Sequence, residues 1–132
     1  MAGIVKLTCK AVLFDMDGTL VDSTRVVELA WGWWAARHDI PLEAVLSFSH
    51  GRPTIATMEH FLAARDHTEE LKEMEHYEET QLEGILAVPG ATQVVDAVKD
   101  HPWAIVTSAG RALAEARHSR GFAPSEGDYP CR

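Results

Sequence analysis

The sequence predicts an α/β protein in which parallel strands with flanking helices carry an inserted all-helical domain. Two short apolar runs, 11–14 and 103–106, are typical of strands buried in a parallel sheet. Between them, residues 24–83 repeat their apolar side chains at helical spacing. A strand, a helical insert, a helix and a second strand together form a parallel crossover connection. We therefore expect the two runs to lie in one sheet.

Apolar spacing and the glycine and proline residues between the periodic segments set the expected helices. These cover approximately residues 24–38, 42–46, 53–62, 68–82, 92–99 and 111–117. Asp22 or Ser23 can cap the first helix. We expect a partial core domain at 1–21 and 86–132, and a helical cap domain at 22–85.

Composition indicates a small soluble globular protein. The chain has 132 residues, of which 46% are hydrophobic and 24% charged. Its net charge of −8 argues against nucleic acid or an anionic membrane as a partner. The sequence shows neither a signal peptide nor an apolar run that approaches a membrane span. Cys9 and Cys131 read as reduced thiols, which favours a cytoplasmic location, and nothing here predicts the oligomeric state.

Two acids follow the first strand directly, in the string Asp15–Ser23 (DMDGTLVDS). Ligands bind at the carboxyl ends of parallel strands. There the carboxylate of Asp15 could attack an electrophile, and Asp17 could exchange a proton with the leaving oxygen. Asp15 and the main-chain carbonyl of Asp17 could bind one hard cation, most plausibly Mg²⁺. A calcium loop is excluded, because Leu20 and Val26 occupy its obligatory glycine and glutamate positions. The alternative is a pair of acids at a solvated strand end.

Two hydroxyls, Thr107 and Ser108, follow the second strand and precede a helix. Hydroxyls and free main-chain N–H groups at the start of a helix can bind an anion. We expect the N–H of Ala109 to contribute to such a site. The alternative is a plain helix cap without a ligand.

Two conspicuous groups have a structural interpretation. Trp31, Trp33 and Trp34 are expected to fill the core of the cap, although together they could also wall a substrate pocket. The glutamates within 69–79 are expected to form a solvated helix face.

The string Asp15–Ser23 closely resembles the first motif of the haloacid dehalogenase-like (HAD) phosphohydrolases. The resemblance implies a Rossmann-like core, with Asp15 as the nucleophile, Asp17 as the general acid and base, and Mg²⁺ as the cofactor. In that family Gly18 begins the turn out of the active site. The resemblance also implies that Thr107 or Ser108 contacts the transferring phosphoryl group.

The loop His50-Gly51-Arg52 is similar to a cap loop that faces the active site in capped members of the family. By that resemblance Arg52 binds the phosphate or a neighbouring polar group of the substrate, and His50 orients the substrate or orders the cap. The alternative is a glycine turn with a solvated arginine.

Two functions remain open. One is a Mg²⁺-dependent phosphatase of a small phosphorylated metabolite, a sugar or polyol phosphate, that works through an aspartyl-phosphate; a mutase is a variant of it. The other is a truncated, non-catalytic fragment with at most a binding role. Family members normally continue with a lysine and further acids, whereas no lysine follows Lys99 and the tail from Ser119 lacks apolar periodicity. On this ground we expect little or no turnover.

Overall fold

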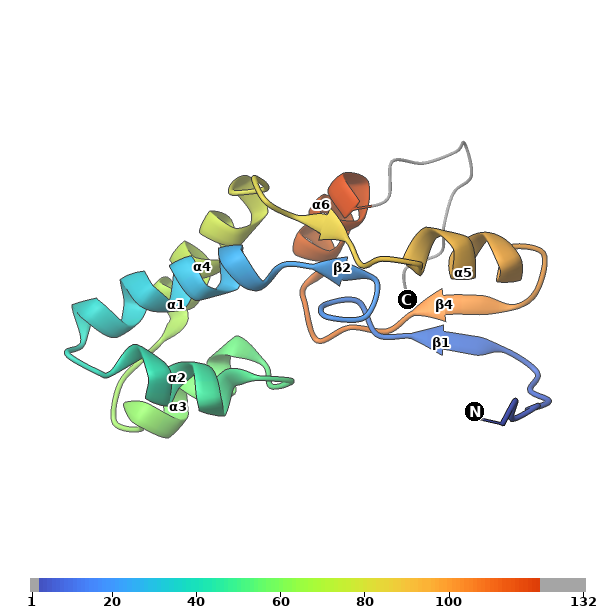
Figure 1. The fold of residues 1–132 in the computed structure, drawn as a ribbon. Coiled ribbons are helices and arrows are strands. Elements are labelled where there is room, and N and C mark those ends of the chain that lie inside the picture. The colour runs from blue at the N-terminus through green and yellow to red at the C-terminus, as the bar shows by residue number, and fades with distance from the viewer. Residues whose placement is uncertain (1–2, 122–132) are drawn as a thin grey trace.

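The computed structural model describes residues 3–121, with the helices of residues 24–80 gathered at one end and the parallel strands toward the other (Figure 1). Within these residues no helix is both long and apolar enough to cross a membrane. In chain order the elements are β1 (Val12–Phe14), β2 (Val21–Asp22), α1 (Thr24–Arg37), α2 (Leu42–Ser49), α3 (Thr54–Phe61), α4 (Thr68–Thr80), β3 (Leu86–Ala87), α5 (Ala91–Val98), β4 (Trp103–Ile105) and α6 (Arg111–Gly121).

Strands β1 and β4 pair in parallel, with Val12 opposite Trp103 and Phe14 opposite Ile105. This pairing confirms the predicted crossover and the α/β class. A second, antiparallel pair joins β2 to β3 and was not predicted. Each of these strands has two residues, too few to show the alternation by which a strand is recognised in a sequence.

The expectation that the two apolar runs are fully buried is wrong. Leu13 is 69% exposed and Val106 is 51% exposed, whereas Ile105 is buried. Helix α5 packs against one face of the two-stranded sheet (Figure 1). Alternate side chains of a strand point to opposite faces of a sheet. Within the described residues, therefore, only one face of this sheet is covered.

Buried apolar side chains form two clusters. The first joins the strand region to the starts of the neighbouring helices through Met16, Leu20, Val21, Val26, Ile85, Ala91, Val95, Ile105 and Ala114. The second fills the helical end with Ala30, Trp31, Trp34, Ala35, Val45, Met58 and Met74. Val26 of α1 belongs to the first cluster, so the first turn of this helix packs on the strand region. The domain boundaries at 21/22 and 85/86 stay a prediction.

The helices match the apolar periodicity, and their ends lie within two residues of expectation except in two places. Helix α2 continues to Ser49, and α6 continues to Gly121, so the start of the tail from Ser119 is helical. The remainder of that tail, with Cys131, lies outside the described residues. At the start of α1 the carboxylate of Asp22 accepts a hydrogen bond from the N–H of Thr24 at 3.0 Å. Ser23 makes no capping hydrogen bond.

The tryptophans divide between the core and the surface. Trp31 and Trp34 are buried and meet edge to face, with ring centroids 5.4 Å apart. Trp33 is 42% exposed, and the Arg37 guanidinium lies 5.4 Å from its ring centroid. Neighbouring positions on a helix are about 100° apart, so residues 31 and 34 share a face that 33 does not. The expectation that Trp33 fills the core is wrong.

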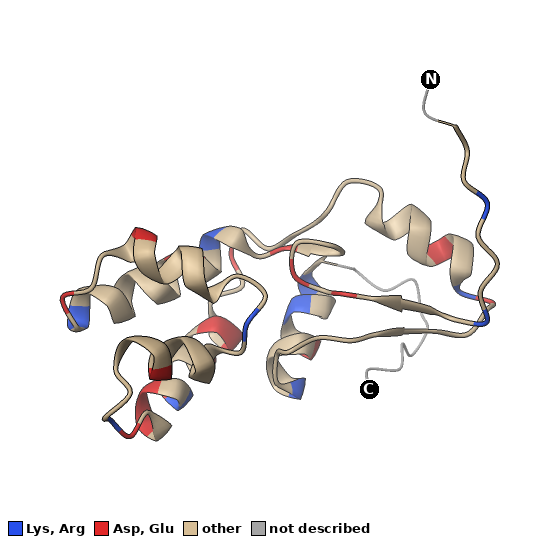
Figure 2. Cartoon of the chain, turned by 90° about the horizontal axis from the view of Figure 1, so that it is seen from below, with Lys and Arg blue, Asp and Glu red and all other residues tan. Residues whose placement is uncertain are grey.

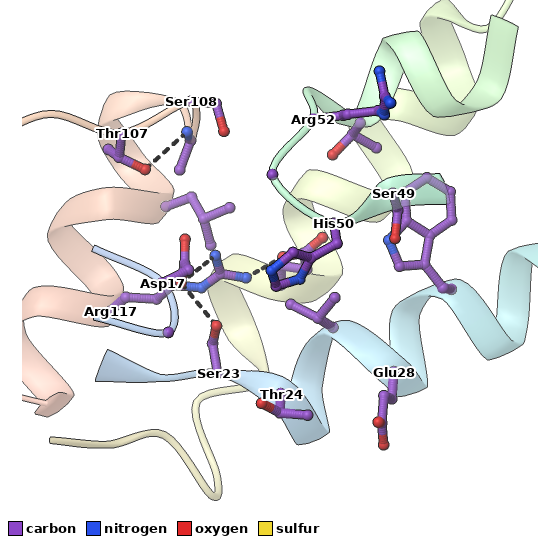
Figure 3. Close-up of a pocket in the computed structure, with 18 of the residues that line it drawn as sticks. Asp17, Ser23, Thr24, Glu28, Ser49, His50, Arg52, Thr107, Ser108 and Arg117 are labelled. Carbon is purple, nitrogen blue, oxygen red and sulfur yellow. Dashed lines mark hydrogen bonds and ion pairs between the residues drawn. The ribbon is translucent and has the colours of Figure 1, made fainter. Parts of the chain in front are cut away.

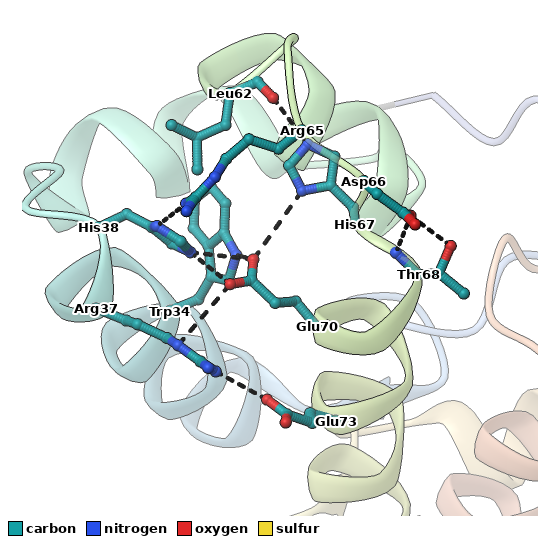
Figure 4. Close-up of polar contacts among 10 residues, drawn as sticks. All are labelled: Trp34, Arg37, His38, Leu62, Arg65, Asp66, His67, Thr68, Glu70 and Glu73. Carbon is teal, nitrogen blue, oxygen red and sulfur yellow. Dashed lines mark hydrogen bonds and ion pairs between the residues drawn. The ribbon is translucent and has the colours of Figure 1, made fainter.

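The glutamates of α4 are not all solvated, which corrects a second expectation. Glu70 accepts hydrogen bonds from Trp34 Nε1 at 3.0 Å and from His38 Nε2 at 2.8 Å (Figure 4). Arg65 donates to the other ring nitrogen of His38 at 2.8 Å, which assigns the His38 proton to Nε2. Burial opposes ionisation of Glu70, but the hydrogen bonds from Trp34 and His38 outweigh it and lower the pKa of this carboxyl.

Replacing Glu70 by glutamine is expected to destabilise the fold near neutral pH, by about 1–2 kcal/mol, because charge-assisted hydrogen bonds are lost. A lowered carboxyl pKa stabilises the folded state above the unfolded pKa of about 4.3, and this contribution is lost as pH falls through the folded pKa. The difference in melting temperature from wild type should therefore be present at pH 7 and shrink in acid. The exposed pair of Arg37 with Glu73, 2.8 Å apart, supplies the control. Glu73→Gln should have almost no effect at either pH.

Candidate active site

A pocket of ≈ 350 Å³ lies between the strand region and the helices (Figure 3). Its walls come from the ends of β1 and β4, the first turns of α1, the loop after α2, and helices α4 and α6. Every residue predicted for the site lines it: Asp15, Asp17, Gly18, His50, Arg52, Thr107, Ser108 and Ala109. Trp31 also lines it, so this tryptophan serves both the core and the pocket wall.

A tight turn after β1 carries the two acids. The carbonyl of Met16 accepts hydrogen bonds from the N–H groups of residues 19, 20 and 21, at 2.9–3.2 Å. Gly18 has a φ of 76°, a left-handed conformation that glycine adopts without steric cost, and its N–H donates to Val21 at 2.8 Å. The turn folds the chain back at once, which leaves Asp15 and Asp17 on the same pocket.

The two carboxylates have different partners. Asp15 Oδ1 accepts a hydrogen bond from the N–H of Met16 at 2.9 Å. Asp17 Oδ1 accepts one from Ser23 Oγ at 2.7 Å and lies 2.9 Å from Nη1 of Arg117 (Figure 3). Asp17 is therefore fixed by the side chains of Ser23 and Arg117, whereas among residues 3–121 Asp15 is held through the adjacent backbone.

The hydroxyl residues after β4 lie at the same sheet edge as Asp15, because β1 and β4 are parallel neighbours. Thr107 Oγ1 accepts a hydrogen bond from the N–H of Ala109 at 3.2 Å. In this arrangement the N–H of Ala109 is engaged by its own turn. Thr107 and Ser108 both line the pocket (Figure 3).

His50 and Arg52 lie across the pocket from Thr107 and Ser108 (Figure 3). The guanidinium of Arg52 stays close to the end of α2: its Nε donates to the carbonyl of Phe48 at 2.9 Å, and its Cζ lies 4.4 Å from that ring centroid. The predicted loop thus faces the cleft from the helical side, with its arginine resting on an aromatic ring.

Ser23, Glu78 and Arg117 also line the pocket and were not predicted for the site. Glu78 and Arg117 are 6% and 3% exposed and form an ion pair between α4 and α6. Burial raises the pKa of Glu78, and the charge of Arg117 opposes that rise. Helical spacing holds a signal for both: Glu78 is four residues after Met74, and Arg117 is four after Leu113, so each continues an apolar face.

The charges at the pocket favour a bound cation. Glutamate-rich α4 and the arginines of α6 belong to neighbouring helices (Figure 2). The pocket lining nevertheless carries four carboxylates and only two guanidinium groups. Within residues 3–121 no group of three or more His, Cys, Asp or Glu side chains could hold a metal ion. Asp15 with the carbonyl of Asp17 offers hard oxygen donors, which suits Mg²⁺, an ion that commonly takes one or two carboxylates and completes its shell with water and phosphate.

Residues 9–124 match the profile of the haloacid dehalogenase-like hydrolases, and the chain belongs to this family. It is 44% identical over 124 residues to hexitol phosphatase A of Escherichia coli (strain K12). This match covers 90% of this chain and 57% of the relative. It is 29% identical over 115 residues to 2-deoxyglucose-6-phosphate phosphatase 2 of Saccharomyces cerevisiae, covering 77% of this chain and 47% of that protein.

Among solved structures, a hydrolase from Pseudomonas syringae superposes with a TM-score of 0.72 at 24% identity. The match covers 85% of this chain and 56% of that structure, and at this identity it shows the fold alone. The chain spans about half the length of the curated relatives it matches. What those proteins act on is carried to this chain only as a proposal.

Proposed function

We propose that the chain carries the site of a Mg²⁺-dependent phosphatase that acts on a small phosphorylated metabolite, a sugar or polyol phosphate. The observation that carries the proposal is the placement of Asp15, Asp17, Thr107 and Ser108 on one pocket at the ends of two adjacent parallel strands. Relatives described as hexitol and 2-deoxyglucose-6-phosphate phosphatases support the substrate class.

In the proposed reaction Asp15 attacks phosphorus in line with the ester oxygen, and the bond from phosphorus to that oxygen breaks. Asp17 protonates the leaving alkoxide and then takes a proton from the water that cleaves the aspartyl-phosphate. Thr107 or Ser108 hydrogen-bonds the phosphoryl oxygens. When bound by Asp15 and the carbonyl of Asp17, Mg²⁺ supplies positive charge against the phosphoryl group.

The helical side of the pocket supplies substrate selection in this proposal. Trp31 presents an aromatic wall, and His50 and Arg52 present hydrogen-bond donors opposite the hydroxyl residues. Aromatic faces and planar donors suit a polyhydroxylated carbon chain that carries a phosphate. The pocket, at ≈ 350 Å³, has room for a small metabolite and lies at the lower end of the usual range for ligand sites.

The test uses the whole chain with a panel of hexitol phosphates, hexose 6-phosphates and p-nitrophenyl phosphate, and measures released inorganic phosphate. Release should require Mg²⁺, stop on chelation with EDTA and return when Mg²⁺ is restored. The proposed activity differs from the expectation of little or no turnover drawn from the sequence alone. Absence of release from every substrate in the presence of Mg²⁺ would reject the proposal and favour the non-catalytic alternative.

A further inference from the structure

Arg117 is the most deeply buried charged group at the pocket, and it joins two acids from different elements. Its Nη1 lies 2.9 Å from Asp17 Oδ1, and its Nη2 forms an ion pair with Glu78 of α4. The side chain is 3% exposed, and within residues 3–121 its Nε has no hydrogen-bond partner. Both amino groups of the guanidinium are therefore engaged by carboxylates.

Two negatively charged groups, Asp17 and Glu78, contact the single positive charge of Arg117. Stability alone would be met by one carboxylate beside Arg117, since a buried charge needs a partner. Here a second carboxylate, Glu78, is also buried at 6% exposure, on a helix where Glu75 is exposed. The second acid has a geometric effect: held at both Nη atoms, the planar guanidinium is fixed in one orientation.

That orientation decides which oxygen of Asp17 is covered. Arg117 and Ser23 both bind Oδ1. If Glu78 lost its charge, its hold on Nη2 would weaken, and the guanidinium could turn to bind both oxygens of Asp17 in the bidentate geometry that arginine favours with carboxylates. Both oxygens would then be occupied, and Asp17 would exchange protons less readily.

We propose that Glu78 is a positioning residue for the phosphoryl-transfer site: through Arg117 it keeps Asp17 Oδ2 available for proton exchange. The inference rests on the proposed function in so far as it assigns proton exchange to Asp17. It links a residue of helix α4 to the turn after β1 without contact between Glu78 and the substrate.

The test compares Glu78→Gln with Glu75→Gln, which removes the same charge from an exposed position one turn earlier on α4. The first readout is the side-chain carboxyl ¹³C resonance of Asp17 in ¹³C-aspartate-labelled protein at pH 7, assigned by its loss in Asp17→Asn. The second is the steady-state kinetics of phosphate release. Glu78→Gln should shift the Asp17 resonance and lower kcat roughly 10–100-fold, the usual effect of removing a partner behind an active-site ligand. KM should change little, and Glu75→Gln should match wild type in both readouts.

An Asp17 resonance that does not move in Glu78→Gln overturns the proposal, and so does a moved resonance with an unchanged kcat. If the resonance moves but the wild-type chain releases no phosphate, the contact from Glu78 to Asp17 is supported and the phosphatase function fails. Should Glu78→Gln not fold, as judged by circular dichroism, Arg117→Lys tests the same link, because one amine cannot reproduce the two-armed contact. Arg120→Lys, at an exposed position on α6, is its control.

Discussion

Replacing Asp15 by asparagine is expected to lower Mg²⁺-dependent phosphate release by on the order of 10³-fold or more, the scale seen when a nucleophile is removed. An amide oxygen does not attack phosphorus, so the aspartyl-phosphate cannot form. The fold should be retained, because asparagine keeps the oxygen that accepts the N–H of Met16 at 2.9 Å. The measurement is inorganic phosphate release by wild type and variant at equal concentration.

Asp22→Asn is the matched control for that experiment. Asp22 ends β2, is exposed, and lies outside the pocket lining. Its carboxylate accepts a local hydrogen bond from the N–H of Thr24, which asparagine can also accept. Wild-type release is expected for this variant. Equal release by Asp15→Asn and wild type would contradict the assignment of Asp15 as the nucleophile.

Replacing Trp34 by alanine is expected to lower the free energy of unfolding by about 3–5 kcal/mol, the usual cost of truncating a buried aromatic side chain. Trp34 is 0% exposed and packs against the rings of Trp31 and His38, with centroids 5.4 and 5.0 Å away. The change also removes the indole N–H that Glu70 accepts. Small domains have about 5–15 kcal/mol of stability in total, so this single loss is large.

The neighbouring Trp33→Ala serves as the control, since it removes the same side chain from a position that is 42% exposed. It loses the contact with Arg37, and the expected cost is below about 1 kcal/mol. Urea unfolding followed by far-ultraviolet circular dichroism measures both variants without relying on tryptophan fluorescence. Similar losses for the two variants would contradict the division of the tryptophans between core and surface.

The parts of the fold that repeat a pattern could be predicted from the sequence. The α1 helix shows apolar spacing over several turns, and the strands β1 and β4 lie within short apolar runs. Burial of β1 could not be predicted from its own residues, because exposure of Leu13 depends on what covers the second face of the sheet. The β2–β3 pair depends on contacts between residues that lie far apart in the sequence, Val21 with Ala87 and Asp22 with Leu86.

Part of the candidate site could also be predicted from the sequence, and part of it could not. Asp15 and Asp17 could be found because they follow a strand within a long, chemically constrained string. Glu78 and Arg117 were missed because a charged residue on a helix is usually solvated, and only their partners in three dimensions make burial tolerable. The position of each on an apolar helix face was the available signal.

The short antiparallel pair of β2 and β3 affects how the sequence of such a chain can evolve. The chain departs toward the four helices at Asp22 and returns at Leu86, and these two residues are register partners (Figure 1). An inserted segment whose two ends lie side by side can lengthen, shorten or be exchanged without disturbing the segments on either side of it. The helices, which in the proposed function select the substrate, can therefore diversify while Asp15 and Asp17 remain where they are.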